Sequence, residues 1–344
     1  MIFWAKYSLW TPLLLHLHIQ YLNMKKLIII LAATLAFTAS VSGQQKRWAV
    51  VELSSIYMRI APDYESALET QELMGTVVEI IAEKGYWREI VSPQPYQAWC
   101  TEKGIVEMSE QEIEAYKAAP KCIFTELYGH VYESPSDKAA TICDLVGGDV
   151  MRIAGNDGKK GRCLKGKWTQ IMLPSGKTGW VRSSQVKLHE GFFSIAKGEG
   201  NSESISDSLM ESIIADAFKL KGVPYLWGGM TPKGVDCSGL VRWSFIMNGV
   251  LLPRNASQMV HCGEDVVLTG EYGSLCIDNL QRGDLVFFGT PATSEKPRRV
   301  THVGIYIGNG RIIHSSHMVR VNSLNPSEPD YYENAHKLIA ARRL

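Results

Sequence analysis

The amino-acid sequence predicts a multidomain protein in which two small all-β domains precede one larger α+β domain. Short β-like runs separated by turn signals fill residues 46–108, and the same order of motifs returns over residues 121–190. From residue 207 onward, two helical patterns come before a series of strand-like runs, which is the order of an α+β domain. A chain of 344 residues is long enough for two or three such domains.

The charge balance argues against two classes of partner. The chain has 36 basic and 35 acidic residues and a net charge of +1. This balance does not indicate nucleic acid or an anionic membrane surface as a partner. The hydrophobic content of 45% is ordinary for a globular protein.

Residues 1–43 are predicted to be an N-terminal extension followed by a secretory signal peptide. Met24 and two lysines start an apolar run that ends in small residues up to Gly43, which is the pattern of a cleaved signal. Residues 1–23 fit this signal poorly, so we interpret Met24 as the true start. A membrane anchor that uses both apolar runs is the alternative. We expect an exported protein, periplasmic or extracellular and cell-wall associated, without stable membrane insertion after signal cleavage.

Seven cysteines in an exported chain allow disulfides, and the odd number leaves at least one thiol free. Cys262–Cys276 and Cys143–Cys163 are the candidate pairs that lie close in sequence, but spacing does not decide the connectivity. The chain has no CxxC pair and no His/Cys spacing typical of zinc sites, so we expect neither a metal nor another cofactor.

Between the two β domains the sequence predicts a connecting helix over residues 109–120. Ser109 and Glu112 have the spacing of a capping box, and Pro120 ends the helix. The second β domain then repeats the motifs of the first, with an insertion at Asn156–Gly166. The matching segments are Tyr57–Pro62 with Val131–Pro135, Leu73–Val77 with Leu145–Val150, Trp87–Ile90 with Trp168–Ile171, and Ala98–Cys100 with Gly179–Val181.

A polar stretch rich in Gly and Ser over residues 191–206 is the predicted linker to the α+β domain, residues 207–344. The first helix of that domain is amphipathic and ends at Gly222. The second is expected to begin near Asp236 and to stop at Gly249. It would place Cys237 at a helix N-terminus, where unpaired N–H groups and the helix dipole favour a thiolate.

A lone cysteine is more often a core residue than a nucleophile, but Cys237 belongs to a set of motifs. Taken in order, these are YLWGG at 225–229, DCSGL at 236–240, RNASQ at 254–258, RGDLVFF at 282–288 and THVGIYIG at 301–308, with a further histidine at His314. In this order they resemble the NlpC family of cell-wall cysteine peptidases, which are papain-like in fold. The resemblance covers roughly residues 207–344.

The resemblance implies a role for each catalytic candidate. Cys237 is expected to be the nucleophile and His302 its base, with His314 orienting the His302 ring. Tyr225 is expected to stabilise the oxyanion beside the Cys237 N–H. The alternative for each histidine is a polar residue on a half-buried strand, and Tyr225 fits a core tyrosine in a turn equally well.

The resemblance also implies the residues that bind substrate. Asp236 and Ser238 flank the nucleophile and are expected to hold the amino end of the substrate and a D-Glu carboxylate. Arg254 and Ser257 match a family motif that lines the groove, although Arg254 fits a structural ion pair equally well. Trp227 is the remaining candidate from the α+β domain.

Each β domain resembles a bacterial SH3-like barrel. Two such domains before an NlpC-type domain form the layout of the γ-D-glutamyl-L-diamino acid endopeptidases. In that group the first SH3-like domain narrows the groove and an acidic residue meets the substrate amine, for which Glu83 is a candidate here. We therefore expect a monomeric enzyme acting on peptidoglycan-derived peptides with a free L-Ala. The alternatives are a lytic endopeptidase or amidase on intact wall, and a wall-binding module with an inactive catalytic domain.

The hairpin between the two histidines tests the enzyme interpretation. A tight two-residue turn at Asn309-Gly310 pairs Gly308 with Arg311 and places the histidines on opposite faces of the sheet. A three-residue loop pairs Ile307 with Arg311 and places them on one face. The enzyme interpretation therefore requires the odd loop, with a glycine in the left-handed region.

Overall fold

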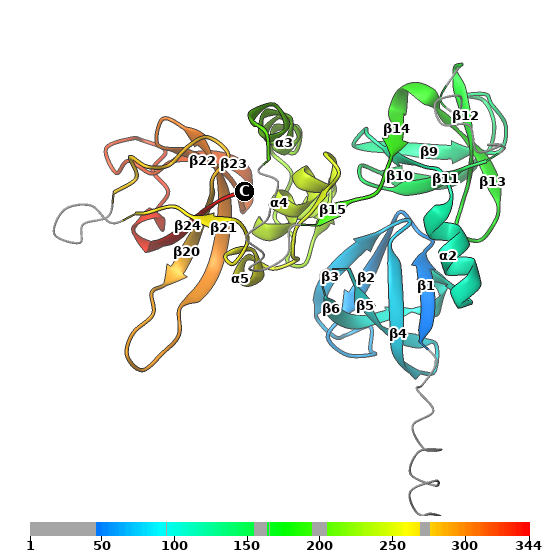
Figure 1. Ribbon diagram of the computed structural model, residues 1–344, viewed down its shortest axis with the longest axis horizontal. Helices are drawn as coiled ribbons and strands as arrows, with labels where there is room; N and C mark the ends of the chain where they lie inside the picture. The colour runs from blue at the N-terminus through cyan, green and yellow to red at the C-terminus, as the bar shows by residue number, and fades with distance from the viewer. Residues whose placement is uncertain (1–45, 94, 155–163, 165, 195–204, 269–275) are drawn as a thin grey trace, which may run out of the picture. The chain divides into compact units, whose positions relative to one another are not determined.

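The computed structural model describes residues 46–93, 95–154, 164, 166–194, 205–268 and 276–344 (Figure 1). The chain divides into two compact units, Met1–Gln45 and Lys46–Leu344, and the second contains all of the described elements. The expected signal peptide and most of the expected linker lie outside the described residues. In the part of the chain that is described, no helix has the length and apolar character needed to cross a membrane.

The first β domain is a seven-stranded antiparallel sheet with the order β3-β2-β6-β5-β4-β1-β7. Apolar side chains alternate along its strands and form a separate small core. The strands are β1 (Arg47–Val51), β2 (Ser55–Arg59), β3 (Leu68–Leu73), β4 (Val77–Lys84), β5 (Trp87–Ser92), β6 (Tyr96–Thr101) and β7 (Ile105–Met108), with the 3-10 turn η1 (Glu102–Gly104) before β7.

The connecting helix α2 (Glu110–Ala118) has the predicted capping box between Ser109 and Glu112. A second seven-stranded sheet follows, with the order β10-β9-β13-β12-β11-β8-β14, which matches the first sheet strand for strand and confirms the internal repeat. Its elements are β8 (Lys121–Phe124), β9 (Tyr128–Tyr132), β10 (Thr141–Val146), β11 (Val150–Ile153), β12 (Trp168–Met172), β13 (Thr178–Arg182), η2 (Ser183–Gln185) and β14 (Val186–His189).

The strand pairings of the described residues do not close either sheet into a barrel. The all-β character of both domains is therefore confirmed, and their identity as SH3-like barrels stays a prediction. The domain boundaries given above also stay predictions.

The last domain places its described α-helices before a six-stranded sheet with the order β19-β24-β20-β21-β22-β23. Its helices are α3 (Asp207–Lys219), α4 (Cys237–Ile246), α5 (Ala256–Met259) and the 3-10 turn η4 (Ala335–Lys337). Its sheet consists of β19 (Glu264–Asp265), β20 (Leu285–Thr290), β21 (Arg299–Gly308), β22 (Arg311–Ser316), β23 (Met318–Ser323) and β24 (Leu338–Arg343). Two short pairs, β15 (Phe193–Ser194) with β18 (Val250–Leu251) and β16 (Met230–Thr231) with β17 (Gly234–Val235), complete the elements.

Helix α4 is buried along its whole length and contacts α3, β21 and β22. Its core also includes apolar residues from both β domains, namely Leu73, Ile123, Val146 and Val150. The Trp243 indole of α4 donates a 2.7 Å hydrogen bond to the Gly147 carbonyl in the second β domain. Residues of all three domains of the second unit therefore meet in one hydrophobic cluster around the helix that begins at Cys237, in addition to the separate smaller cores.

The hairpin between β21 and β22 differs in form from the expected odd loop. Gly308 pairs with Arg311 across a two-residue turn whose residues Asn309 and Gly310 both have positive φ. A β-bulge next to this turn restores the required register, because Ile305 then faces Ile313. The three-residue loop was therefore wrong, but the two histidines lie on the same face of the sheet.

Neither candidate disulfide is found among the described residues. Cys276 carries a free thiol, so the Cys262–Cys276 pair is not formed. Cys143 carries a free thiol as well, so the expected pair with Cys163, which lies outside the described residues, is not formed either.

Candidate active site

Cys237 is the first residue of α4, as the sequence predicted, and its side chain is 8% exposed. Asp236 is the N-cap and accepts a 2.6 Å hydrogen bond from the Gly239 N–H. The N–H of a first helical residue has no acceptor inside the helix, so the Cys237 N–H is available to a substrate oxygen. Gly239 allows this tight start, since a Cβ there would lie 2.1 Å from the Gly229 carbonyl oxygen.

The start of the helix favours the Cys237 thiolate as expected, through the Ser238 N–H, but burial outweighs this effect. Burial, and after it the nearby Asp236 carboxylate, raise the pKa of the Cys237 thiol to about 11. The backbone N–H groups of Val303 and Ser238 act in the opposite direction but do not compensate for the loss of solvent. The thiol is therefore neutral near pH 7.

His302 on β21 and His314 on β22 meet directly, with 2.8 Å between His302 Nε2 and His314 Nδ1. The second ring nitrogen of His314, Nε2, lies 2.9 Å from Oδ1 of Asn322 on β23. Burial lowers the pKa of His302 to about 3 and that of His314 to about 4. Both rings are therefore neutral near pH 7, and the rings of Phe288 and Tyr332 pack around them.

The described hydrogen bonds include none between the Cys237 thiol and the His302 ring. The group from β21 that reaches the thiol is the N–H of Val303, the residue after His302. Catalytic hydrogen bonds are often long in a free enzyme and tighten when the substrate binds. Cys237 therefore lies next to the segment of β21 that carries His302. Proton transfer between them requires their side chains to come closer.

Tyr225 lies at the start of the YLWGG segment, where its N–H donates a 2.8 Å hydrogen bond to the His317 carbonyl. Burial raises the pKa of its phenol, and the neighbouring Cys237 and Asp236 raise it further. The hydroxyl therefore stays protonated and can donate. It has no hydrogen-bond partner among the described residues, which leaves it available for an oxyanion.

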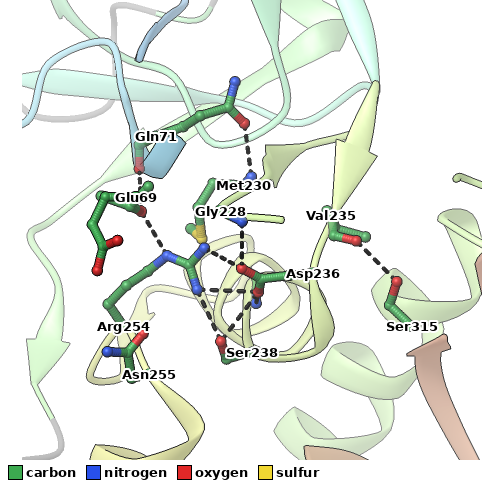
Figure 2. Close-up of polar contacts among 12 residues, drawn as sticks. Glu69, Gln71, Gly228, Met230, Val235, Asp236, Ser238, Arg254, Asn255 and Ser315 are labelled. Carbon is green, nitrogen blue, oxygen red and sulfur yellow. Dashed lines mark hydrogen bonds and ion pairs between the residues drawn. The ribbon is translucent and has the colours of Figure 1, made fainter. Parts of the chain in front are cut away.

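Asp236, Ser238 and Arg254, two of which flank the nucleophile in sequence, form a buried network (Figure 2). Arg254 binds both carboxylate oxygens of Asp236, at 2.6 and 3.1 Å, and donates a 2.9 Å hydrogen bond to the Ser238 hydroxyl. Asp236 also accepts hydrogen bonds from Ser238 Oγ and the Gly228 N–H. Because all three side chains have partners inside the protein, they hold the nucleophile loop in place, and a direct substrate contact for them stays a prediction.

Strand β3 of the first β domain completes this network. The Thr70 hydroxyl accepts a 2.6 Å hydrogen bond from Nε of Arg254, and the Gln71 side chain accepts a 2.8 Å bond from the Met230 N–H (Figure 2). Gly228 of the YLWGG segment has positive φ, and a Cβ there would lie 3.0 Å from the Glu69 carbonyl carbon and oxygen. The first β domain therefore contacts the candidate active site through β3.

The contacts of Glu83 do not support its expected role. Its carboxylate is exposed and pairs with Arg47 at 2.7 Å and with Arg88 at 3.9 Å, both in its own domain. Glu69, which was not among the residues expected from the sequence, is an acidic residue of β3 whose contacts lead to the site. It accepts a hydrogen bond from the Tyr96 hydroxyl, which in turn lies 3.4 Å from Nδ2 of Asn255. No sequence motif distinguishes Glu69 from the other carboxylates, because only the packing of β3 reveals its position.

Two further candidates are accessible. Trp227 is 66% exposed, and Ser257 lies on the exposed side of α5 without a hydrogen-bond partner among the described residues. Their exposure leaves both accessible to a ligand, and a contact of either with the substrate stays a prediction. Within the described residues, no group of three or more His, Cys, Asp or Glu side chains is arranged to hold a metal ion.

Comparison with known proteins agrees with this geometry. The model of the NlpC/P60 family matches residues 222–339. Dipeptidyl-peptidase 6 of Lysinibacillus sphaericus is 26% identical over 286 residues, which cover 81% of this chain and 93% of that protein. The gamma-D-glutamyl-L-lysine dipeptidyl-peptidase of Bacillus cereus is 27% identical over 275 residues, 77% of this chain and 73% of that protein.

A crystal structure of an NlpC/P60 family protein from Bacillus cereus has the same fold. It aligns with a TM-score of 0.64 and 22% identity over 86% of this chain and 99% of that chain. The family match, the contact between His302 and His314, and the hydrogen bond of the neighbouring Val303 N–H to the Cys237 thiol support one conclusion. The chain carries an NlpC/P60 domain over residues 222–339 and is a cysteine peptidase.

Proposed function

We propose that this protein hydrolyses the bond between γ-D-glutamate and L-lysine or meso-diaminopimelate in peptidoglycan stem peptides that have a free amino-terminal L-alanine. The observation that carries the proposal is the contact of β3 with the YLWGG segment, which brings Glu69 next to the candidate active site. Relatives named gamma-D-glutamyl-L-lysine dipeptidyl-peptidase support the choice of bond. A dipeptidyl-peptidase removes two residues from a free amino end.

The proposed chemistry begins with a neutral pair. Because His302 Nε2 contacts His314, Nδ1 is the nitrogen left to accept the Cys237 proton. The sulfur attacks the γ-carbonyl carbon as that proton leaves, and the oxyanion accepts hydrogen bonds from the Tyr225 hydroxyl and the Cys237 N–H.

The second half of the reaction returns the enzyme to its starting state. His302 gives the proton to the departing amine of the diamino acid, and a thioester between Cys237 and γ-D-glutamate remains. Water then attacks the thioester, its proton passes to His302, and the thiol is restored.

Recognition of the amino end is proposed to depend on Glu69. A charged α-amine that leaves water needs an acidic partner, since an unpaired buried ammonium group is costly. Glu69 is half-buried beside Tyr96, whose hydroxyl uses only part of the acceptor capacity of the carboxylate. An acylated L-alanine has lost its charge and gained bulk, so it would be bound poorly.

Exchange of this carboxylate tests the proposal. Glu69→Gln should lower kcat/KM for L-Ala-γ-D-Glu-L-Lys by about 10- to 100-fold, since a hydrogen bond to a charged group contributes about 1.5–3 kcal/mol. Glu83→Gln is the matched control, because Glu83 binds only arginines of its own domain among the described residues. It should leave the rate unchanged. Equal rates on free and N-acetylated peptides with the intact protein would instead favour a lytic endopeptidase or amidase that acts on the wall.

Export to the cell wall or periplasm is part of the same proposal. The basic start and apolar run before Gln44 support export. An exported enzyme would also meet its expected substrate, which is made of wall peptide. An amino terminus at Gln44 on the protein recovered outside the cytoplasm would support cleavage of a signal.

A further inference from the structure

A chain of hydrogen bonds crosses three neighbouring strands behind the candidate base. It runs from His302 on β21 to His314 on β22 and then to Asn322 on β23. It continues beyond the two histidines expected from the sequence, because Nδ2 of Asn322 lies 2.6 Å from the backbone carbonyl oxygen of Asp330. His314 is completely buried and Asn322 nearly so, so bulk water cannot replace these partners.

The Asp330 carbonyl fixes the direction of the whole chain. A carbonyl oxygen only accepts, so the Asn322 amide must point its NH2 group at Asp330 and its Oδ1 at His314. The same carbonyl also accepts a 3.1 Å hydrogen bond from the Ser323 N–H, which holds it in place. The Asp330 side chain pairs with Arg311 and anchors this loop to β22.

The orientation of the amide determines the hydrogens on both rings. Because Oδ1 accepts, Nε2 of the neutral His314 carries the ring hydrogen and its Nδ1 has a lone pair. That lone pair accepts from Nε2 of His302, so the His302 hydrogen is on Nε2. Nδ1 of His302 is then left with the lone pair that a general base needs.

The opposite orientation of the Asn322 amide would place two hydrogen-bond acceptors against each other. With the amide reversed, Oδ1 of Asn322 would face the Asp330 oxygen, and two acceptors would meet without a hydrogen between them. Buried polar groups that lose their hydrogen-bond partners are costly. Arg320, the charged group that acts electrostatically on both rings, opposes a second positive charge there and so favours two neutral histidines.

We propose that Asn322 is a positioning residue, which, through the Asp330 carbonyl, selects the ring tautomers of His314 and His302 and so presents His302 Nδ1 to Cys237. This inference rests on the proposed role of His302 as the base. Asn322 does not touch the reacting atoms and acts only through the two histidines.

The decisive measurement is the ring tautomer of His302, read from 15N NMR of the histidine side chains. It is made in the Cys237→Ala protein, where no thiol proton competes and where no activity is needed. His302 and His314 should both carry their hydrogen on Nε2. A hydrogen on Nδ1 of His302 would overturn the proposal without any substitution at Asn322.

Substitution then tests the cause. Asn322→Leu removes the acceptor that faces His314 and should give His302 a mixture of tautomers. Asn279→Leu is the control, since Asn279 is an exposed amide whose side chain binds the Val267 carbonyl outside the site. An unchanged His302 tautomer in Asn322→Leu would refute the role of Asn322.

Steady-state kinetics of the protein that keeps Cys237 distinguish this inference from the proposed function. Asn322→Leu should lower kcat by about 10- to 100-fold, the range typical of a group that orients a functional histidine, with KM nearly unchanged. A proportional rise in KM with unchanged kcat would contradict a positioning role. If the wild-type protein does not cleave the peptide although the Nε2 tautomer is found, the proposed function fails and the tautomer assignment stands.

Discussion

At the scale of single residues, burial decides the resting charge of the catalytic pair. The rise in the pKa of Cys237 from 9.0 to about 11 corresponds to about 3 kcal/mol against the thiolate. The dipole at the start of a helix supplies up to about 2 kcal/mol in partly buried geometries, which is smaller. The residue pattern predicted the position of Cys237 and its helix. It does not show how far solvent reaches the sulfur.

The rate of alkylation of Cys237 should therefore rise with pH. Only the thiolate reacts, and with a pKa near 11 its fraction increases about tenfold per pH unit between pH 6 and pH 9. Iodoacetamide labelling of this residue, followed by mass spectrometry, measures the rate, and Cys237→Ala gives the background. A rate that is already constant between pH 5 and pH 8 would show a preformed thiolate–imidazolium pair instead.

The two histidines should differ in their tolerance of substitution. Cys237→Ala and His302→Ala should each lower kcat by several orders of magnitude, because nucleophile and base act as one unit. His314→Gln should be milder, since an amide can still accept from His302 and donate to Asn322. If His314→Gln loses as much activity as His302→Ala in single-turnover assays, the orienting role of His314 is wrong.

At the scale of elements, the β21–β22 hairpin and strand β3 position the site. Alternation along the strands predicted that both histidines must share a face, and the Asn309-Gly310 pair is typical of the two-residue turn that is present. The bulge that reconciles these requirements could not be predicted, since no feature of Ile307 or Gly308 alone indicates an unpaired residue. The role of β3 was also missed, because contacts between segments far apart in sequence depend on packing.

The hydrogen bond from Arg254 to Thr70 should stabilise the contact between β3 and the site. Thr70→Val keeps the shape but leaves Nε of Arg254 unpaired in a buried position. The free energy of unfolding should fall by about 1–3 kcal/mol, with a loss of activity because Arg254 also holds Asp236. Thr178→Val, on an exposed strand position, is the control for denaturant unfolding. Equal stability of the two variants would show that the Thr70 bond contributes nothing.

At the scale of the whole molecule, buried neutral histidines couple stability to pH. The pKa values of His302 and His314 are lowered in the folded protein, so the unfolded chain binds more protons below about pH 6.5. Stability should therefore decrease as the pH falls from about 6.5 toward 4. Asp149, whose pKa is raised by complete burial, acts in the opposite direction, so the net slope alone does not isolate the histidines.

A comparison of variants isolates the histidine contribution. His314→Gln should flatten the decrease in the free energy of unfolding between pH 6.5 and pH 4.5, by up to about 1.4 kcal/mol per pH unit. Asp149 is present in both proteins and its effect cancels. His130→Gln, at an exposed position in the second β domain, is the matched control and should keep the wild-type slope. A slope that is the same in all three proteins would contradict the burial of a neutral His314.

The most direct test of the central claim is the cleavage of a free stem peptide. L-Ala-γ-D-Glu-L-Lys, its meso-diaminopimelate analogue, the corresponding tetrapeptides and intact wall are each incubated with the wild-type protein and with Cys237→Ala, and the products are identified by mass. The account predicts release of the dipeptide L-Ala-D-Glu from free peptides by the wild-type protein, and none by Cys237→Ala. Cleavage at another bond, or dipeptide release that persists without the Cys237 thiol, would contradict it.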